Sequence, residues 1–291
     1  MTSTIRRLAV LTALALFVAV PAPVHADALV TVSATRNGST VTVNGSAALP
    51  DGALAAVLED PPADANIVAA NTAGDLTRVS LATQSDGDLV VQWAVASLPA
   101  EPAGALGLAR LRFRAGGSDY EIAAARNDHS SASTDPGGWL IRCGANGCLS
   151  AASGALITRD VGVTVSTSAD VIEATVPVTS LGGVLSPGSL IEPFGGTPGT
   201  EAATGLGQLE AQSDQDTADM IGTFTYGLVV LLGTAAPGAD PATVDYAAAA
   251  AVAPDNYTFS GSFEVPEGQA VFAKACLGGS STCAYGQSQG V

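Results

Sequence analysis

One histidine in this sequence lies among serines and acids in a way that could support catalysis. His129 stands in "RNDHSSASTDPGG", and its polar neighbours are Asp128, Ser130, Ser131 and Asp135. Nucleophilic catalysis needs a base beside the nucleophile and a third group that orients the base, so a catalytic triad is conceivable here. A single histidine among loop serines is far more often a solvated loop residue. The sequence therefore favours a loop without catalytic chemistry.

Paired carboxylates are the second arrangement that could do chemistry, as in glycoside hydrolases. Most of the 27 acidic residues fall in turns and connections, and the acids inside apolar strands are Glu121 and Glu173. Aromatic residues, which a glycosidase uses to hold sugar rings, are only 5% of the chain. Nucleophile-elbow, zinc-protease, phosphate-loop and dinucleotide motifs are also missing from the sequence. We therefore predict a protein that is not an enzyme and has no catalytic residues.

The segment "EDPPADAN", Glu59 to Asn66, could supply oxygen ligands to a cation. Pro61 and Pro62 hold the chain extended, so the acids are displayed on a stiff loop. Calcium takes roughly six to eight oxygen ligands, although the spacing here is not that of a 12-residue calcium loop. The side chains that could contribute are Asp60, Asp64, Asn66 and Asp75. The alternative, which the residues alone favour, is a solvated acidic turn.

The stretch "LARLRFRAGGSDYEIAAAR" predicts a β-hairpin with a four-residue loop at Ala115–Ser118. Because side chains alternate between the faces of a strand, a single register satisfies both faces. It pairs Arg114 with Asp119, Arg112 with Glu121, Phe113 with Tyr120, and Leu111 with Ile122.

Three arginines, Arg110, Arg112 and Arg114, share one face of this hairpin. One interpretation is a binding site for an anionic sugar or another carboxylate ligand. The other is cross-strand pairing with Asp119 and Glu121 on a solvated face, where ion pairs contribute little. The sequence favours the second, and the three arginines remain candidate ligand-binding residues.

Four cysteines form two close pairs, Cys143 with Cys148 and Cys276 with Cys283. Zinc sites also use paired cysteines, but usually at shorter spacing and often with histidine. In an exported chain this pattern favours two disulfides that each close a small loop.

The N-terminal segment predicts export. Residues 1–26 contain Arg6 and Arg7, a short apolar run and the small-x-small site Val24-His25-Ala26, as in a secretory signal peptide. Its removal would leave nine basic residues against 27 acidic ones, a net charge of −18. Such a surface disfavours nucleic acid and anionic membranes as partners. We expect a secreted, extracellular, monomeric bacterial protein without membrane insertion.

Hydrophobic alternation on both sides of Asn37-Gly38 and Asp86-Gly87 predicts β-hairpins, and helical periodicity is poor. The fold class that follows is an all-β antiparallel β-sandwich, jelly-roll or immunoglobulin-like, with at most one or two short helices. We expect an N-terminal β-hairpin (27–56) packed on a main β-sandwich (57–263), followed by C-terminal disulfide-stapled strands (264–291).

The order "EDPPADAN…DLTRVSLATQSDGDLVVQWAVASLP" resembles the start of bacterial exported β-sandwich domains related to family-9 carbohydrate-binding modules and DOMON domains. The resemblance covers residues 57–263. It implies a jelly-roll-like sandwich with a binding role and, in some members, a metal near the opening loop, which makes calcium the one cofactor expected here. Trp93 is predicted to face the core, and Trp139 to be the aromatic platform for a glycan.

Two functions from different classes are compatible with these observations. The first is a secreted non-catalytic binding protein whose ligand is a glycan or another cell-envelope component. The second is a structural or interaction protein of the cell envelope without a small-molecule ligand; a hydrolase ranks below both. An aromatic-lined concave face would favour the first. A flat apolar patch or an unpaired edge strand would favour the second.

Overall fold

The computed structural model describes residues 29–59, 76–98, 108–125, 137–144, 148, 154–194, 206–211, 214–219, 223–254, 256–278 and 283–291. Within these residues the protein is all-β with antiparallel sheets, as hydrophobic alternation predicts. Its helical segments are α1 (Val178–Leu181) and the 3-10 turn η2 (Pro241–Thr243). Among the described helices, neither is long and apolar enough to cross a membrane.

Strands from the first and last described parts of the chain form one sandwich, called here the terminal sandwich. One sheet has the order β1-β2-β19-β18 and the other β17-β16-β20-β21. The strands are β1 (Leu29–Asn37), β2 (Thr40–Ala48), β16 (Leu228–Ala235), β17 (Ala248–Ala249), β18 (Ala251–Val252), β19 (Thr258–Glu264), β20 (Ala270–Leu277) and β21 (Cys283–Gly290).

The strands between them build a second sandwich, the inserted sandwich. One sheet has the order β10-β11-β5-β4-β3, and the other β14-β13-β6-β7-β8-β9, with β12 pairing to β6 and β15. The strands are β3 (Ala55–Glu59), β4 (Leu76–Thr83), β5 (Leu89–Val95), β6 (Leu108–Ala115), β7 (Ser118–Ala125), β8 (Gly137–Cys143), β9 (Gly154–Thr158), β10 (Gly162–Ser166), β11 (Val171–Val176), β12 (Leu190–Pro193), β13 (Leu206–Ala211), β14 (Asp214–Asp219) and β15 (Phe224–Thr225).

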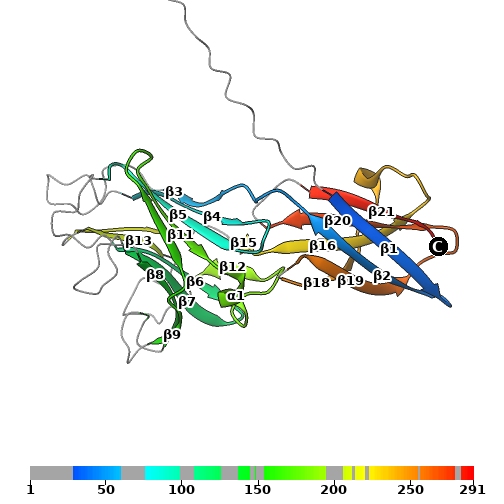
Figure 1. Ribbon diagram of the computed structural model, residues 1–291, viewed down its shortest axis with the longest axis horizontal. Coiled ribbons are helices and arrows are strands. Elements are labelled where there is room, and N and C mark those ends of the chain that lie inside the picture. Colours follow the sequence, from blue (N-terminus) through cyan, green and yellow to red (C-terminus); the bar gives the residue numbers. More distant parts are fainter. Residues whose placement is uncertain are drawn as a thin grey trace, which may run out of the picture.

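The two sandwiches lie end to end in an elongated molecule (Figure 1). Each has its own hydrophobic core, centred on residues such as Trp93, Leu111 and Ile172 in the inserted sandwich, and Val41 and Phe259 in the terminal one. Figure 1 shows the blue N-terminal hairpin beside the orange and red C-terminal strands.

The N-terminal hairpin forms as its alternation predicts. Gly38 has a φ of 65°, and the strands pair in a register that places Val30 and Val32 on the same face as Val41 and Val43. That face is apolar because it covers the core of the terminal sandwich. The hairpin pairs through β2 with β19, and shares its core with β20 and β21 of the expected 264–291 segment. The sandwich boundaries therefore do not follow the segments 27–56, 57–263 and 264–291.

The turn between β4 and β5 is where the two sandwiches meet. The Tyr226 hydroxyl donates a 2.6 Å hydrogen bond to the Gly87 carbonyl, and the Tyr257 hydroxyl donates to the Gln84 carbonyl at 3.0 Å. Gly87 has a φ of 94°, and a Cβ there would lie 2.8 Å from the Pro254 carbonyl oxygen. The close approach therefore requires glycine at this position.

Two acidic side chains of this turn accept hydrogen bonds from backbone N–H groups. An Asp86 carboxylate oxygen accepts a hydrogen bond from the Asp88 N–H at 3.0 Å, and Asp88 accepts one from the Val178 N–H at 2.8 Å. Burial raises the pKa of Asp88, a shift that the Val178 hydrogen bond partly offsets. These contacts tie the turn to the start of α1.

Candidate functional site

The arginine hairpin has the predicted register. Arg112 pairs with Glu121, Arg114 with Asp119, and Phe113 with Tyr120. Ala115 pairs with Ser118, so the connection is a two-residue Gly116-Gly117 turn rather than a four-residue loop. Both glycines have positive φ, of 54° and 77°, which explains the glycine pair at this tight turn.

The face carrying the arginines is buried at Arg110 and Arg112, which corrects the expectation of a solvated face there. Arg112 is 3% exposed and Glu121 is fully buried; the Arg112 Nε donates a 2.8 Å hydrogen bond to a Glu121 carboxylate oxygen. Arg110, on the same face, is 4% exposed. The Arg112 guanidinium also lies 6.0 Å from the centre of the Phe194 ring. The charges of this pair are therefore compensated inside the protein.

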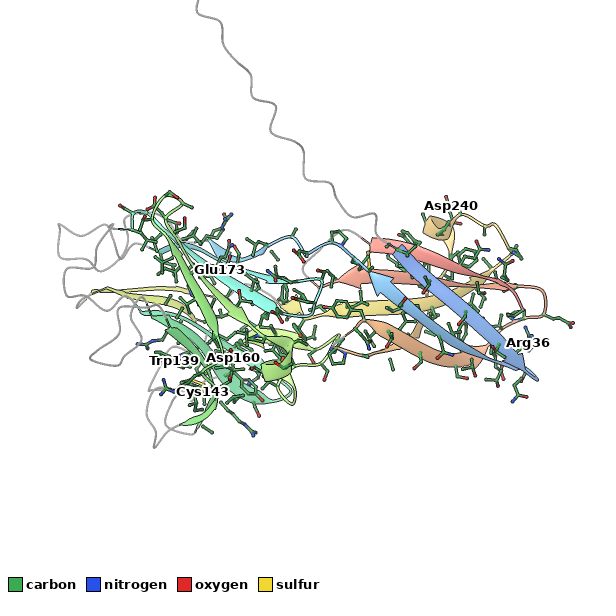
Figure 2. All side chains as sticks on the ribbon, in the orientation of Figure 1. Arg36, Trp139, Cys143, Asp160, Glu173 and Asp240 are labelled. Carbon is green, nitrogen blue, oxygen red and sulfur yellow. A yellow bond between two sulfur atoms is a disulfide. The ribbon has the colours of Figure 1, made fainter. Side chains whose placement is uncertain are left out.

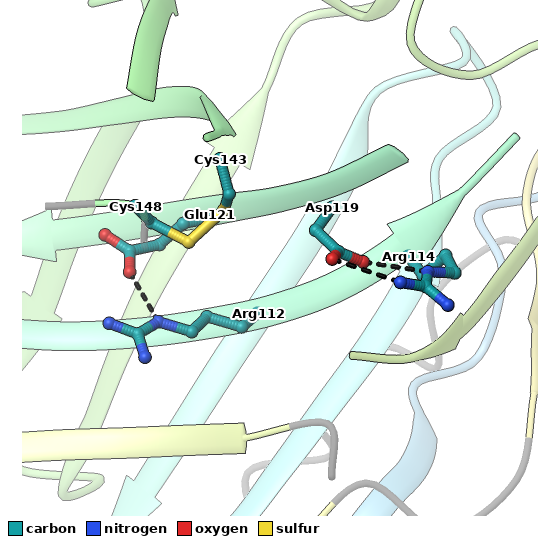
Figure 3. The surroundings of a disulfide bond; sticks show 6 residues. All are labelled: Arg112, Arg114, Asp119, Glu121, Cys143 and Cys148. Atoms are coloured by element: carbon teal, nitrogen blue, oxygen red, sulfur yellow. Dashed lines mark hydrogen bonds and ion pairs between the residues drawn. A yellow bond between two sulfur atoms is a disulfide. The ribbon is translucent and has the colours of Figure 1, made fainter. Parts of the chain in front are cut away.

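The disulfide between Cys143 and Cys148 lies beside Glu121 (Figure 3). Cys143 is two residues from Ile141, the cross-strand neighbour of Glu121, so it occupies the same face of the sheet. Cys148 is 2% exposed. The staple thus helps to cover the ion pair.

Arg114 is the most accessible of the three arginines. Its guanidinium makes two hydrogen bonds to Asp119, of 2.9 and 3.2 Å, and the side chains are 37% and 20% exposed. The hydrogen bond and charge of Asp119 raise the pKa of Arg114. An anionic ligand would have to compete with this carboxylate, as it would with Glu121 at Arg112.

The two tryptophans differ in exposure. Trp93 is fully buried in the core, as predicted, and its indole N–H donates a 3.0 Å hydrogen bond to the Arg110 carbonyl. Trp139, the expected glycan platform, is half-buried and packs against Ala123 of β7. It belongs to the outer face of the sheet, on the strand that carries Cys143 (Figure 2).

The expected metal ligands Asp60, Asp64, Asn66 and Asp75, like His129, lie outside the described residues. Calcium at the acidic loop therefore stays a prediction. Among the described residues, no group of three or more histidine, cysteine, aspartate or glutamate side chains is arranged to hold a metal ion.

Both predicted disulfides form. The Cα atoms of Cys143 and Cys148 are 4.2 Å apart, and those of Cys276 and Cys283 are 4.3 Å apart. Each bond closes a short loop, and the pattern fits folding in an oxidising environment.

A feature that the sequence analysis missed is the edge strand β9. It pairs with β8 and ends its sheet, and in the described chain no strand pairs with its other side. Leu156 is 52% exposed and its neighbour Ile157 is 37% exposed. A β-bulge falls here, because Leu140 pairs with Thr158 while Ile141 pairs with Leu156. The bulge places Ile157 outside the regular alternation and re-aims its side chain.

Two arginines lie near this surface, called here the β9 edge (Leu156 and Ile157). Arg142 of β8 pairs with Ala155 of β9, so its side chain lies on the sheet face opposite to Leu156. It is exposed, and its guanidinium donates to the Ser118 hydroxyl at 2.9 Å. Arg159 follows β9 directly and is also exposed. Two adjacent branched apolar residues ahead of an Arg-Asp turn are the only signal of this edge in the sequence. No family model, curated protein or solved structure matches the chain, so the fold and these surfaces stand on the geometry described above.

Proposed function

We propose that this chain is a non-catalytic, exported interaction protein of the cell envelope that binds a protein partner at the β9 edge. The observation that carries the proposal is the exposure of Leu156 and Ile157 on a strand that ends its sheet. Soluble proteins usually protect such edges with charges or cover them, because an open edge offers backbone groups to another strand. An exposed apolar edge is thus suited to receiving an extended polypeptide segment.

The apolar surface extends onto β8. Ile141 pairs directly with Leu156, and Trp139 lies two residues before Ile141 on the same face. Both are half-buried. A partner that covers the β9 edge would also bury part of these side chains, and contiguous apolar surface of this kind is typical of interaction sites.

Local charge indicates what kind of partner fits. The chain has 11 basic residues against 27 acidic ones, yet Arg159 directly follows β9 and Arg142 lies on the neighbouring strand β8, on the other face of the sheet. They favour an extended segment with apolar residues and acidic flanks. A second copy of this chain is a poorer occupant, because two strongly acidic molecules repel each other as they approach.

The buried arginine face argues against the first function considered from the sequence. An anionic glycan at Arg112 would have to enter a buried ion pair, and one at Arg114 would have to displace Asp119. These costs lower the rank of a glycan site on this sheet.

The proposal is tested by binding of purified protein (residues 27–291) to isolated cell-envelope fragments, with and without prior protease treatment of the fragments. We expect a protease-sensitive part of the binding, and Leu156→Glu should reduce that part by about tenfold through a charge placed at the apolar contact. Leu190→Glu is the matched control, because Leu190 is 47% exposed on β12 of the same sandwich. Binding without a protease-sensitive part, or an equal loss in both variants, would refute the proposal. Sedimentation of the protein alone identifies self-association, which would also count against it.

A further inference from the structure

We propose a second binding surface, for a neutral saccharide, on the terminal sandwich. It consists of Tyr246, Tyr285 and Lys274, called here the tyrosine ledge. The two tyrosine rings lie 6.2 Å apart between centroids and are inclined at 42°. Tyr285 is 40% exposed, and both Tyr246 and Lys274 are partly exposed. Among the aromatic side chains whose exposure the structure describes, Tyr285 is the most exposed.

The sheet fixes two members of the ledge. Lys274 on β20 pairs directly with Tyr285 on β21. Cys276 and Cys283 pair two residues farther along the same strands, so their disulfide lies on the same face. This covalent link restrains the hairpin that carries Lys274 and Tyr285. Less side-chain and backbone freedom is then lost when a ligand binds.

The loop before β17 positions the third member. The backbone carbonyl of Asp245 lies so close over Gly233 of β16 that a Cβ at residue 233 would overlap it. Phe272 pairs with Gly233 and is fully buried, although its neighbour Lys274 on the same face is partly exposed. The loop therefore lies on the outer face of the sheet, where it brings Tyr246 against Tyr285.

Hydrogen bonds within the loop fix its shape. The Tyr246 hydroxyl donates a 3.0 Å bond to the Pro241 carbonyl. Asp240 caps η2 by accepting a 3.0 Å bond from the Ala242 N–H, and the Thr243 hydroxyl donates to the Asp240 carbonyl at 2.8 Å. Burial, followed by the neighbouring Tyr285 and Asp240, raises the pKa of Tyr246 to about 12. The hydroxyl thus stays protonated at neutral pH and can keep donating to Pro241.

These groups match the chemistry of a sugar ring. A pyranose has an apolar C–H face, which packs on an aromatic face, and a rim of hydroxyl groups, which accept and donate hydrogen bonds. Tyr285 offers the exposed ring, and the Lys274 ammonium offers hydrogen-bond donors beside it.

The electrostatics favour a neutral saccharide over an acidic one. Asp240 lies close enough to influence the charge state of Tyr246, and the whole chain carries a formal net charge of −16. An anionic polysaccharide would be repelled on approach. Lys274, the only lysine of the chain, supplies hydrogen bonds rather than a basic patch.

The tyrosine ledge and the β9 edge belong to different sandwiches. Asp240 lies next to the ledge on the terminal sandwich, and Cys143 lies near the β9 edge on the inserted one (Figure 2). The ledge does not depend on the β9 edge. If both surfaces bind, the elongated molecule connects a saccharide to a protein.

The test is calorimetric titration of purified protein (residues 27–291) with cellohexaose, maltohexaose and chitohexaose. At least one should bind saturably, and Tyr285→Ala should weaken it by about tenfold, the loss expected when one well-contacted aromatic side chain is truncated. Tyr285→Phe should bind like the wild type because the ring remains. Trp139→Ala should also bind like the wild type, because Trp139 lies on the other sandwich.

Amide chemical shifts of the wild-type protein give a second measurement that needs no variant. Titration with the bound hexasaccharide should shift the signals of Lys274 and Tyr285 and leave those of Trp139 unchanged. Failure of all three hexasaccharides to bind would overturn the proposal. So would shifts centred on Trp139, or loss of binding in Trp139→Ala but not in Tyr285→Ala. The readouts use pure sugars, so they are independent of the envelope-binding assay for the β9 edge.

Discussion

The hydroxyl of Tyr226 donates a 2.6 Å hydrogen bond to the carbonyl oxygen of Gly87 at the end of the inserted sandwich that meets the terminal one. The next residue, Gly227, donates its N–H to the Thr83 hydroxyl at 3.0 Å and accepts from the Gly278 N–H at 2.8 Å. Tyr226 is 1% exposed. One short segment therefore holds the β4–β5 turn and the start of β16 together through buried polar contacts.

Tyr226→Phe should destabilise the protein by about 1–3 kcal/mol, because it removes the donor from a buried carbonyl while keeping the ring. Urea unfolding measures the change. Tyr246→Phe is the control, since it removes a more accessible bond to Pro241 and should cost less than about 1 kcal/mol. Equal stability of Tyr226→Phe and the wild type would mean that the Gly87 contact does not contribute to folding.

Alkaline pH should weaken the same region. Burial, the leading cause, raises the pKa of Tyr226 and Tyr257 well above the ordinary value of 10.0. The unfolded chain then releases these protons at lower pH than the folded one, so the stabilisation is complete below pH 10 and is lost as pH rises above it. The free energy of unfolding should fall by up to about 1.4 kcal/mol per pH unit for each tyrosine.

Urea titrations at pH 8, 9, 10 and 11 measure this dependence. A double variant, Tyr226→Phe with Tyr257→Phe, should show a flatter decline above pH 10 than the wild type. Identical slopes in the two proteins would assign the alkaline loss to other groups.

Much of the fold could be predicted because it depends on local patterns. Alternation and turn glycines gave the hairpin at Gly38 and the register of Arg112 with Glu121. The pairing of β2 with β19 could not be foreseen, because it joins residues more than 200 positions apart through side chains that are unremarkable locally. Apolar alternation identifies which face is buried but leaves open which distant strand covers it.

The candidate surfaces were harder to predict for a related reason. The arginine face looked solvated because a charged strand face usually is, and the cover supplied by Cys148 and Phe194 comes from other parts of the chain. Tyr246 and Tyr285 are 39 positions apart, and only the loop over Gly233 brings them together. A bulge such as that at Ile157 leaves almost no trace in a short apolar run.

Calcium binding at the acidic loop is a prediction from the sequence alone. Melting temperature should rise in several millimolar calcium relative to chelator, and both Asp60→Ala and Asp64→Ala should reduce the rise. Extracellular sites of this kind bind at roughly 0.1–1 mM, and a hundredfold excess over the dissociation constant would add about 2.7 kcal/mol. Asp245→Ala, which removes an exposed acid on the terminal sandwich, is the control. No shift in the wild type, or a full shift in both loop variants, would exclude this loop.

The buried Arg112–Glu121 pair gives a sharp stability test. Glu121→Gln should destabilise the protein by about 3–5 kcal/mol, because it leaves the Arg112 charge buried without its carboxylate. Asp119→Asn is the matched control on the same strand; its pair with Arg114 is partly exposed, so the loss should be at most about 1 kcal/mol. Urea unfolding at neutral pH compares the two variants.

A double replacement separates the net contribution of the ion pair to stability from the destabilisation caused by leaving one buried charge unpaired. Arg112→Met with Glu121→Leu removes both charges and keeps apolar volume, so it should recover most of the stability lost in Glu121→Gln. Such recovery would indicate that the ion pair serves the packing of this sheet and is not a ligand site. If Glu121→Gln lowers the free energy of unfolding no more than Asp119→Asn does, then water reaches Arg112 in solution. The arginine face would then again be a candidate site for anionic ligands.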